Sequence, residues 1–249
     1  MKYILLLSTF CLLLLSSCNT SAENISVADQ SISQDSLIKV VEKRLADKKK
    51  LSLLRKELSQ STIGLRINKY KPIIKKYSKR YGFDWRLIVA QIVQESGFRE
   101  KARSRVGASG LMQIMPLTAK EIGQELDIEF IMKNPRENIT AGIYHLKKQM
   151  RYFPDSQINE RTRLALASYN AGAGRVFDAQ ELAKYHKKPD NRWNNVKPYL
   201  AKLKHSDWEL HLQVWPGGQP KYGYFYGFAE TTQYVDRIWE AYSIYRQIL

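Results

Sequence analysis

The feature that most restricts the fold is the spacing of apolar residues from residue 70 to the C-terminus. Most segments there repeat apolar side chains with helical spacing, whereas the two-residue alternation of β-strands is scarce. Glycine- and proline-containing segments separate these stretches, among them GASG, KNP, FPD, NAGAG and WPGGQP. The pattern predicts a mainly α domain over residues 70–249, and a chain of 249 residues that is 44% apolar can build its core.

Residues 1–17 indicate a bacterial export signal. They carry one early lysine and an apolar stretch too short to cross a membrane comfortably. A core helix is the alternative, which the polar segment that follows disfavours. Leu15-Ser16-Ser17-Cys18 resembles a lipobox, which implies cleavage before Cys18 and acylation of its thiol, so that the mature chain is tethered by lipid. Asn19 lacks the aspartate that retains some enterobacterial lipoproteins at the inner membrane, which favours the outer membrane.

Two segments are expected between this signal and the main domain. Residues 18–35 are rich in Ser, Asn, Asp and Gln, a composition typical of a flexible tether. Residues 36–69 form an amphipathic helical segment, in which apolar residues recur among lysines from Ser36 to about Ser59. This helix packs on the main domain or lies on a membrane, and packing is the favoured alternative.

Charge and metal-binding residues limit the partners. Forty Lys and Arg against 24 Asp and Glu give a net charge of +16, compatible with nucleic acid, acidic lipid or a carboxylate-bearing polymer. Export removes the chain from nucleic acid. Cys11 leaves with the signal, so no disulfide within the chain is expected. No metal and no cofactor are expected, because phosphate-loop and dinucleotide motifs are missing and the four histidines lack zinc-ligand spacing: His145, His186, His205 and His211.

Glu95 is the candidate for acid–base chemistry. The segment FDWRLIVAQIVQES predicts a helix that Asp84 caps and that ends at Gly97. Glu95 follows Ile88 by seven positions and Ile92 by three, so it extends from the buried face. Burial raises the pKa of a carboxyl group and keeps it protonated near neutral pH, as a general acid requires. The alternative is a structural glutamate that caps a helix or pairs with an arginine.

Two downstream segments carry further candidates. In GASGLMQIMP, the amide of Gln113 beside apolar residues suits an N-acetyl sugar. Thr118 and Glu121 have the spacing of a capping box, which predicts that the glycine-rich segment from Gly107 to Pro116 runs directly into another helix. In ALASYNAGAG, a helix is expected to end at Tyr169 and Asn170, presenting a phenol and an amide at an exposed turn.

These segments together resemble a known family. The successive motifs of the soluble-lytic-transglycosylase (SLT) family are matched, in order and spacing, by Glu95-Ser96, Gly110 to Pro116, Ala167 to Gly172, and Glu230 with Tyr234-Val235. The resemblance covers about residues 70–249, and the final stretch is most similar to the catalytic module of the F type of membrane-bound enzymes. It implies a goose-lysozyme-like α domain that cleaves the MurNAc-(β-1,4)-GlcNAc bond of peptidoglycan without water and leaves 1,6-anhydro-MurNAc ends.

The same resemblance implies residue roles. Glu95 would be the single catalytic acid and base, and the substrate-binding positions would be Ser104, Gln113, Met115, Tyr169, Asn170 and Glu230. The sequence departs from the family at Arg99-Glu100, where Asn-Pro is common, and at Arg105, where proline is usual. These positions fall in a loop, so they affect substrate preference, and the added arginines can meet carboxylates of the peptide stem.

Two alternatives remain open. Hydrolytic glycosidases use two carboxyl groups about 5 to 9.5 Å apart. The motifs between Ser96 and Gly174 offer no second carboxylate placed like Glu95, which disfavours a muramidase on the same fold. A substrate-assisted route needs only one carboxylate. The other alternative is a non-catalytic peptidoglycan-binding lipoprotein, which the presence of Glu95 within otherwise complete motifs disfavours.

Overall fold

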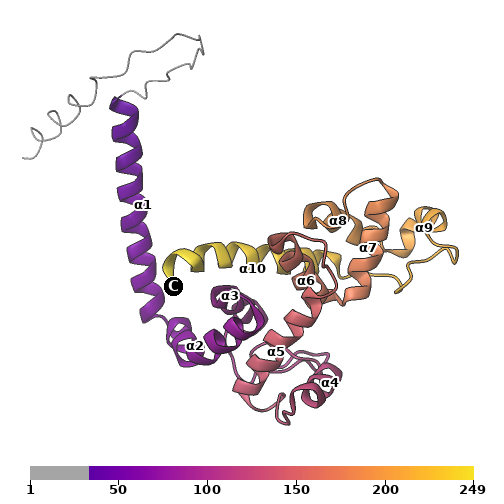
Figure 1. Cartoon of the computed structure of the whole chain (residues 1–249), viewed down its shortest axis with the longest axis horizontal. Helices are drawn as coiled ribbons and strands as arrows, with labels where there is room; N and C mark the ends of the chain where they lie inside the picture. Colours follow the sequence, from indigo (N-terminus) through magenta and orange to yellow (C-terminus); the bar gives the residue numbers. More distant parts are fainter. Residues whose placement is uncertain (1–33) are drawn as a thin grey trace, which may run out of the picture. The chain divides into compact units, whose positions relative to one another are not determined.

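The structure is a computed structural model that describes residues 34–249, with side chains from Lys39 onward. The predicted signal peptide, the lipidation site at Cys18 and nearly all of the predicted tether lie outside the described residues. Every regular element of the described part is helical, which confirms the mainly α prediction (Figure 1). The elements are α1 Gln34–Gln60, α2 Thr62–Tyr81, α3 Trp85–Ser96, α4 Pro116–Leu126, α5 Pro135–Met150, α6 Ile158–Ala171, α7 Ala173–Tyr185, α8 Trp193–Leu200, the 3₁₀ turn η1 His205–Asp207, α9 Trp208–Val214 and α10 Phe228–Ile248.

Helix α1 confirms the helix expected from Ser36 to about Ser59. The chain divides into two compact units, one ending at Ala46 and one covering Asp47–Leu249. In the second unit Leu58 packs against the core, and Arg55 donates to the backbone carbonyls of Gln247 and Ile248. Packing therefore accounts for the C-terminal part of α1. None of the helices in residues 34–249 is both long and apolar enough to pass through a membrane.

Helix α2 belongs to the core of the second unit. Ser61 caps it by accepting a hydrogen bond from the Gly64 amide. Ile67 and Tyr70 are both buried in the main core. The expected domain start at residue 70 thus lies inside α2, and the helix that contains it begins at Thr62.

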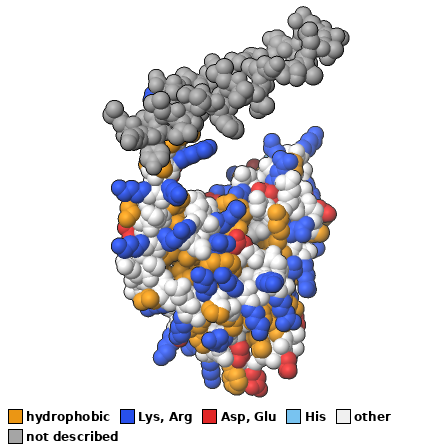
Figure 2. Space-filling model, turned by 60° about the vertical axis from the view of Figure 1, so that its left-hand side comes forward, with side chains coloured by type: hydrophobic (Ala, Val, Ile, Leu, Met, Phe, Trp, Pro, Cys, Tyr) orange, Lys and Arg blue, Asp and Glu red, His pale blue; other side chains and the backbone are white. Residues whose placement is uncertain are grey.

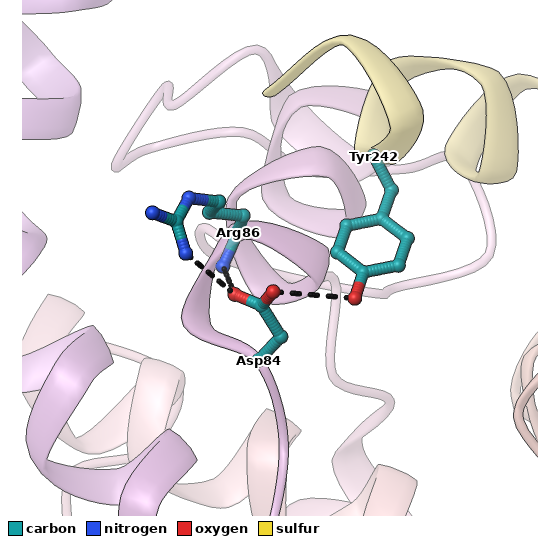
Figure 3. A network of polar contacts seen from close by, with 3 residues as sticks. All are labelled: Asp84, Arg86 and Tyr242. Carbon is teal, nitrogen blue, oxygen red and sulfur yellow. Dashed lines mark hydrogen bonds and ion pairs between the residues drawn. The ribbon is translucent and has the colours of Figure 1, made fainter. Parts of the chain in front are cut away.

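Helix α3 has the predicted ends. The Asp84 carboxylate accepts from the Arg86 amide at 3.0 Å, and Gly97 closes the helix in the left-handed conformation. The same carboxylate accepts from the phenol of Tyr242 on α10 at 3.2 Å and from the Arg86 guanidinium at 3.4 Å (Figure 3). One side chain therefore caps α3 and joins it to α10.

The core forms where apolar helix faces meet. Helix α10 packs along α3 and α6, α5 packs against α2 and α6, and α7 packs between α6 and α8 (Figure 1). Within α3, Ile88 and Ile92 are fully buried, as their spacing predicts. The result is that α3, with Glu95 in its last turn, lies against α2 on one side and α10 on another.

Helix α4 starts earlier than the capping box predicts. Its N-cap is Met115 without a side-chain cap, and Pro116 occupies the first turn. Proline pre-sets the helical φ and needs no amide partner, so it starts the helix two residues before Thr118. The helix expected directly after the glycine-rich segment is therefore confirmed, whereas the capping box of Thr118 and Glu121 does not start it.

The surface is strongly cationic. Lys and Arg side chains are spread over the face in Figure 2, with far fewer Asp and Glu side chains. This view agrees with the net charge of +16. Where ion pairs form, they are on the surface, such as Lys69 with Glu100 and Lys197 with Asp236. Such pairs contribute little to stability. Because cationic side chains outnumber anionic ones, many Lys and Arg side chains remain available to an anionic partner.

Candidate active site

Glu95 lies in the last turn of α3 and is partly buried. Its Oε1 accepts a hydrogen bond of 2.5 Å from the phenol of Tyr234 on α10. That phenol in turn accepts a bond of 3.1 Å from the side-chain amide of Gln91, a fully buried residue one turn before Glu95. Among the described residues Oε2 has no hydrogen-bond partner. One carboxyl oxygen is therefore held, and the other is available to a ligand.

The Glu95 carboxyl group is a weak acid in this environment. Burial raises its pKa from 4.5 to about 8. The hydrogen bond from Tyr234 acts in the opposite direction because it stabilises the ionised form, and the negative charge of Glu230 raises the pKa further. The group is largely protonated at neutral pH, which agrees with the expectation for a general acid.

A well-ordered loop faces the end of α3. Ser96 Oγ donates to the Leu111 carbonyl at 2.8 Å and so joins α3 to this loop. Buried Asn138 on α5 accepts from the Met112 amide and donates to the carbonyls of Ser109 and Ile131. The side-chain oxygen and nitrogen of Asn138 are both hydrogen-bonded, so this residue holds the loop in one position relative to α5.

Gln113 belongs to the same loop and adopts a positive φ of 47°. Its side-chain nitrogen donates to the carbonyls of Ala102 and Gly110, at 3.1 and 2.9 Å. Gln113 and Glu95 line one pocket. The amide nitrogen is committed to the protein, so only the side-chain oxygen of Gln113 is left for a ligand.

Tyr169 lies at the C-terminal end of α6 and is partly buried, as is Asn170 beside it. The Tyr169 phenol donates to the Met112 carbonyl at 2.8 Å, and its ring packs edge-on against His145. Burial, followed by the charge of Glu95, raises the Tyr169 pKa well above its usual value. The helix continues to Ala171, so the exposed turn expected at Tyr169 and Asn170 is in fact a packed helix end close to Glu95.

Asn170 and Glu230 come together through α10. The Asn170 side-chain oxygen accepts from Thr231 Oγ1 at 2.7 Å, which joins the end of α6 to the start of α10. Glu230 precedes Thr231 in the first turn of α10, is exposed, and lies close enough to Glu95 to raise its pKa. The structure thus places a second carboxylate at the site, from a part of the chain outside the central motifs.

Ser104 and Met115 are placed differently. Ser104 Oγ accepts from the Ala108 amide at 2.9 Å and closes a tight turn in the loop. Met115 is 41% exposed at the N-terminus of α4. Among the described residues, neither is hydrogen-bonded to Glu95 or lines the pocket that contains it.

The pocket at Glu95 has a volume of about 370 Å³. It is lined by Glu95, Arg99, Lys101, Ala102, Arg103 and Gln113. Gln91 was not predicted as a site residue, although its place four residues before Glu95 puts both on one helix face. Lys101 and Arg103 were not predicted either, because no local pattern in the sequence marks them as pocket residues. No group of three His, Cys, Asp or Glu side chains in the described part of the chain is arranged to hold a metal ion.

Comparison with known proteins relates the chain to one family. Residues 72–193 match the family model described as Transglycosylase SLT domain. The chain carries an SLT domain. It is similar to the "Membrane-bound lytic murein transglycosylase F" of Desulfosudis oleivorans, with 39% identity over 74% of this chain and 38% of that protein. The protein of the same name from Vibrio campbellii is 36% identical over 68% of this chain and 29% of its own length.

The SLT-domain chain spans about a third of the length of these curated relatives. Among solved structures, an inactive mutant of the lytic transglycosylase Slt from Pseudomonas aeruginosa matches with 30% identity and a TM-score of 0.47. That match covers 72% of this chain and 24% of the other.

Proposed function

We propose that this chain is a peptidoglycan lytic transglycosylase that cleaves the MurNAc-(β-1,4)-GlcNAc bond without water and leaves 1,6-anhydro-MurNAc ends. The observation that carries the proposal is Glu95, a partly buried carboxyl group with a pKa of about 8 in a pocket of about 370 Å³. The names of the relatives, lytic murein transglycosylases, support the same reaction.

The reaction needs one proton carrier used twice. Protonated Glu95 donates its proton to the glycosidic oxygen, and the bond between C1 of MurNAc and that oxygen breaks. The carbonyl oxygen of the sugar's own N-acetyl group bonds to C1 and stabilises the positive charge. Ionised Glu95 then removes the proton from the C6 hydroxyl, O6 attacks C1, and the N-acetyl group is released. Glu95 ends protonated, ready for another turnover.

The unpartnered oxygen of Glu95 is the one suited to this work, because Tyr234 already occupies the other. A hydrogen bond from Tyr234 also keeps the carboxylate formed in the first step from becoming too strong a base, since it stabilises the ionised form. Tyr169 and Asn170 are proposed to orient the intermediate. Gln113, Ser104, Met115 and Glu230 are proposed to contact the sugars.

A hydrolytic muramidase is the second candidate, and Glu230 is the residue it requires. Glu230 is exposed and affects the Glu95 pKa less than burial does. A base that activates water would need to stand opposite Glu95 across the sugar. The product distinguishes the two reactions.

The location of the enzyme is also proposed. Lipid on Cys18 would tether the chain to the outer membrane with the SLT domain facing the periplasm. The word "membrane-bound" in the names of the relatives supports attachment to a membrane. Detergent partitioning tests the tether: Cys18→Ser is expected to leave the protein uncleaved or soluble, and unchanged partitioning into the detergent phase contradicts it.

The reaction is tested by mass analysis of fragments released from purified sacculi in water enriched in oxygen-18. Anhydro ends are expected, each lighter by one water than the hydrolysed fragment and free of the heavy isotope. Glu95→Gln keeps the shape but cannot carry the proton, so activity is expected to fall by about 10²- to 10⁴-fold while binding to sacculi persists. Isotope at the reducing end assigns the chain to the muramidases, and an active Glu95→Gln enzyme removes Glu95 from the mechanism.

A further inference from the structure

Three cationic side chains line the pocket that contains Glu95. Arg99, Lys101 and Arg103 alternate along one short segment that begins three residues after α3 ends. We refer to these three residues as the cationic rim. No ion pair involving any of them is found among the described residues. The rim therefore adds three uncompensated positive charges to one wall of the pocket.

The nearest acidic residue in sequence does not neutralise the rim. Glu100 is the one carboxylate between Ser96 and Lys120. It pairs with Lys69 on α2 at 2.6 Å, and the hydrogen bond from Lys69 is the main reason that the Glu100 pKa is lowered. The acidic group is thus held against α2, while its neighbours on either side line the pocket.

The rim lies apart from the carboxyl group of Glu95. Arg99, Lys101 and Arg103 are all exposed, whereas Glu95 is partly buried in the last turn of α3. The three cations therefore belong to the outer part of the pocket. They are placed to contact a part of the ligand that extends away from the reacting centre.

The backbone that carries the rim is ordered. The Ala102 carbonyl accepts from the Gly110 amide at 2.9 Å and from the Gln113 side chain at 3.1 Å. The backbone of Arg103 forms an antiparallel β-bridge with that of Ser109. Arg99 Nε donates to the Ser96 carbonyl at 2.9 Å, which leaves both terminal nitrogens of the Arg99 guanidinium free for a ligand. Pre-organised cations lose little conformational freedom when they bind a carboxylate.

We propose that the cationic rim is a binding site for the free carboxylates of the peptide stem attached to the sugar that is being cleaved. The inference rests on the proposed function. The stem is attached to the sugar next to the scissile bond, so its carboxylates are joined to the glycan that occupies the Glu95 pocket. A ligand held in the same pocket as the acid fits this requirement better than an anionic polymer that is not joined to the glycan.

The consequence is a preference for stems whose carboxyl groups are free. Cross-linking or amidation removes such charges, and the rim then faces a neutral group. Exposed ion pairs are individually weak, so three together are expected to give a discrimination of about tenfold at low salt, reduced as salt screens them.

The test compares two preparations of the same soluble glycan strands, one with intact stems and one with stem carboxyl groups amidated by a carbodiimide and ammonia. Binding is measured with the full chain, purified in detergent and carrying Glu95→Gln to stop turnover. We expect dissociation constants about tenfold lower for the carboxylate form. The ratio of the dissociation constants for amidated and intact strands is expected to fall to near one in a variant that combines Arg99→Gln, Lys101→Gln and Arg103→Gln.

A matched control removes the same charge elsewhere. Lys79, Lys133 and Lys188 are exposed, lie outside ion pairs and are remote in sequence from the rim. Changing all three to glutamine is expected to keep the tenfold ratio, which separates the rim from the general positive charge of the protein. Equal binding of both strands by the parent, or equal loss of the ratio in rim and control variants, overturns the proposal.

The proposed reaction is scored separately, by the anhydro products that the chain with Glu95 intact releases. If the chain discriminates between the two strands but releases no anhydro products, the proposed reaction is refuted and the proposed role of the cationic rim is supported. Anhydro products without discrimination refute the rim and leave the reaction.

Discussion

Tyr234 and Glu95 face each other on antiparallel helices, and the phenol of Tyr234 donates to Oε1 of Glu95 at 2.5 Å. The same phenol accepts from Gln91, so the direction of the hydrogen bond toward Glu95 is fixed. Tyr234 is itself buried, and burial raises its pKa well above the usual value, so the phenol keeps its proton throughout the working pH range. Glu95 is thus paired with a permanent donor.

Tyr234→Phe tests this pairing through the pH dependence of the rate. The hydrogen bond lowers the Glu95 pKa, so its loss raises that pKa and moves the alkaline limb of kcat/KM, expected near pH 8 in the parent, to higher pH. Turnover is expected to fall about tenfold, because one hydrogen bond to a charged group contributes about 1.5 kcal/mol. An alkaline limb displaced to lower pH contradicts the arrangement.

Glu95→Gln has a predicted effect on stability as well as on activity. The pKa of Glu95 is about 8 in the folded chain and 4.5 in the unfolded chain, so the folded state holds its proton more tightly. The contribution of Glu95 to stability is complete below pH 4.5 and is lost as pH rises through about 8. Glutamine does not titrate. From pH 4 to pH 9 the parent is therefore expected to lose about 1 to 3 kcal/mol more unfolding free energy than the variant loses.

Thermal or urea unfolding at the two pH values measures this difference. Comparing each protein with itself at pH 4 cancels the effect of the substitution on packing. A variant with the same pH dependence of unfolding as the parent shows that the Glu95 carboxyl group is not buried in the folded chain.

Glu230→Gln distinguishes a supporting charge from a second catalytic carboxylate. The Glu230 charge raises the Glu95 pKa, so removing it is expected to lower that pKa and move the alkaline limb to lower pH. Turnover is expected to fall by less than about tenfold, because no proton transfer is lost. The fragments are expected to remain anhydro products. A loss of about 100-fold or more, together with hydrolysed ends in the parent, assigns Glu230 as the base of a muramidase.

Gly110→Ala is expected to disrupt the loop that faces Glu95. Gly110 has a φ of +84°, and a Cβ there would lie 2.4 Å from the side-chain nitrogen of Asn138. Gly82 provides the control, since its φ is +79° and a Cβ meets nothing within 4 Å. Gly82→Ala is expected to cost about 1 kcal/mol of unfolding free energy from backbone strain. Gly110→Ala is expected to cost about 2 kcal/mol more and to lower activity, because displacing Asn138 leaves buried polar groups unpaired. Equal losses in urea unfolding would show that the loop yields without cost.

Helix positions and the burial of Glu95 could be predicted because they depend on local spacing. Ile88, Ile92 and Glu95 share one face at intervals of three or four residues, and Asp84 and Gly97 are typical helix ends. The helix after the glycine-rich segment was also predicted, but its N-cap was not, because Pro116 sets the backbone two residues before Thr118.

Contacts between distant segments could not be predicted in the same way. Glu230 lies near Glu95 because the hydrogen bond from Thr231 to Asn170 joins α10 to α6, and no sequence spacing encodes that contact. Gln113 lines the pocket with Glu95, and the carbonyls that hold its amide come from Ala102 and Gly110. Their positions depend on the tertiary course of the loop.

The hydrogen bond between Asp84 and Tyr242 at one end of α3 has a consequence for the motion of the opposite end (Figure 3). Together with the bond between Glu95 and Tyr234, it holds α3 to α10 at two points separated by the whole length of α3. Backbone amides in the middle of α3 should then exchange with deuterium only when the entire domain unfolds, whereas those of the exposed part of α1 exchange through local fraying. The acid would thus keep its place while a polymer enters and leaves the pocket.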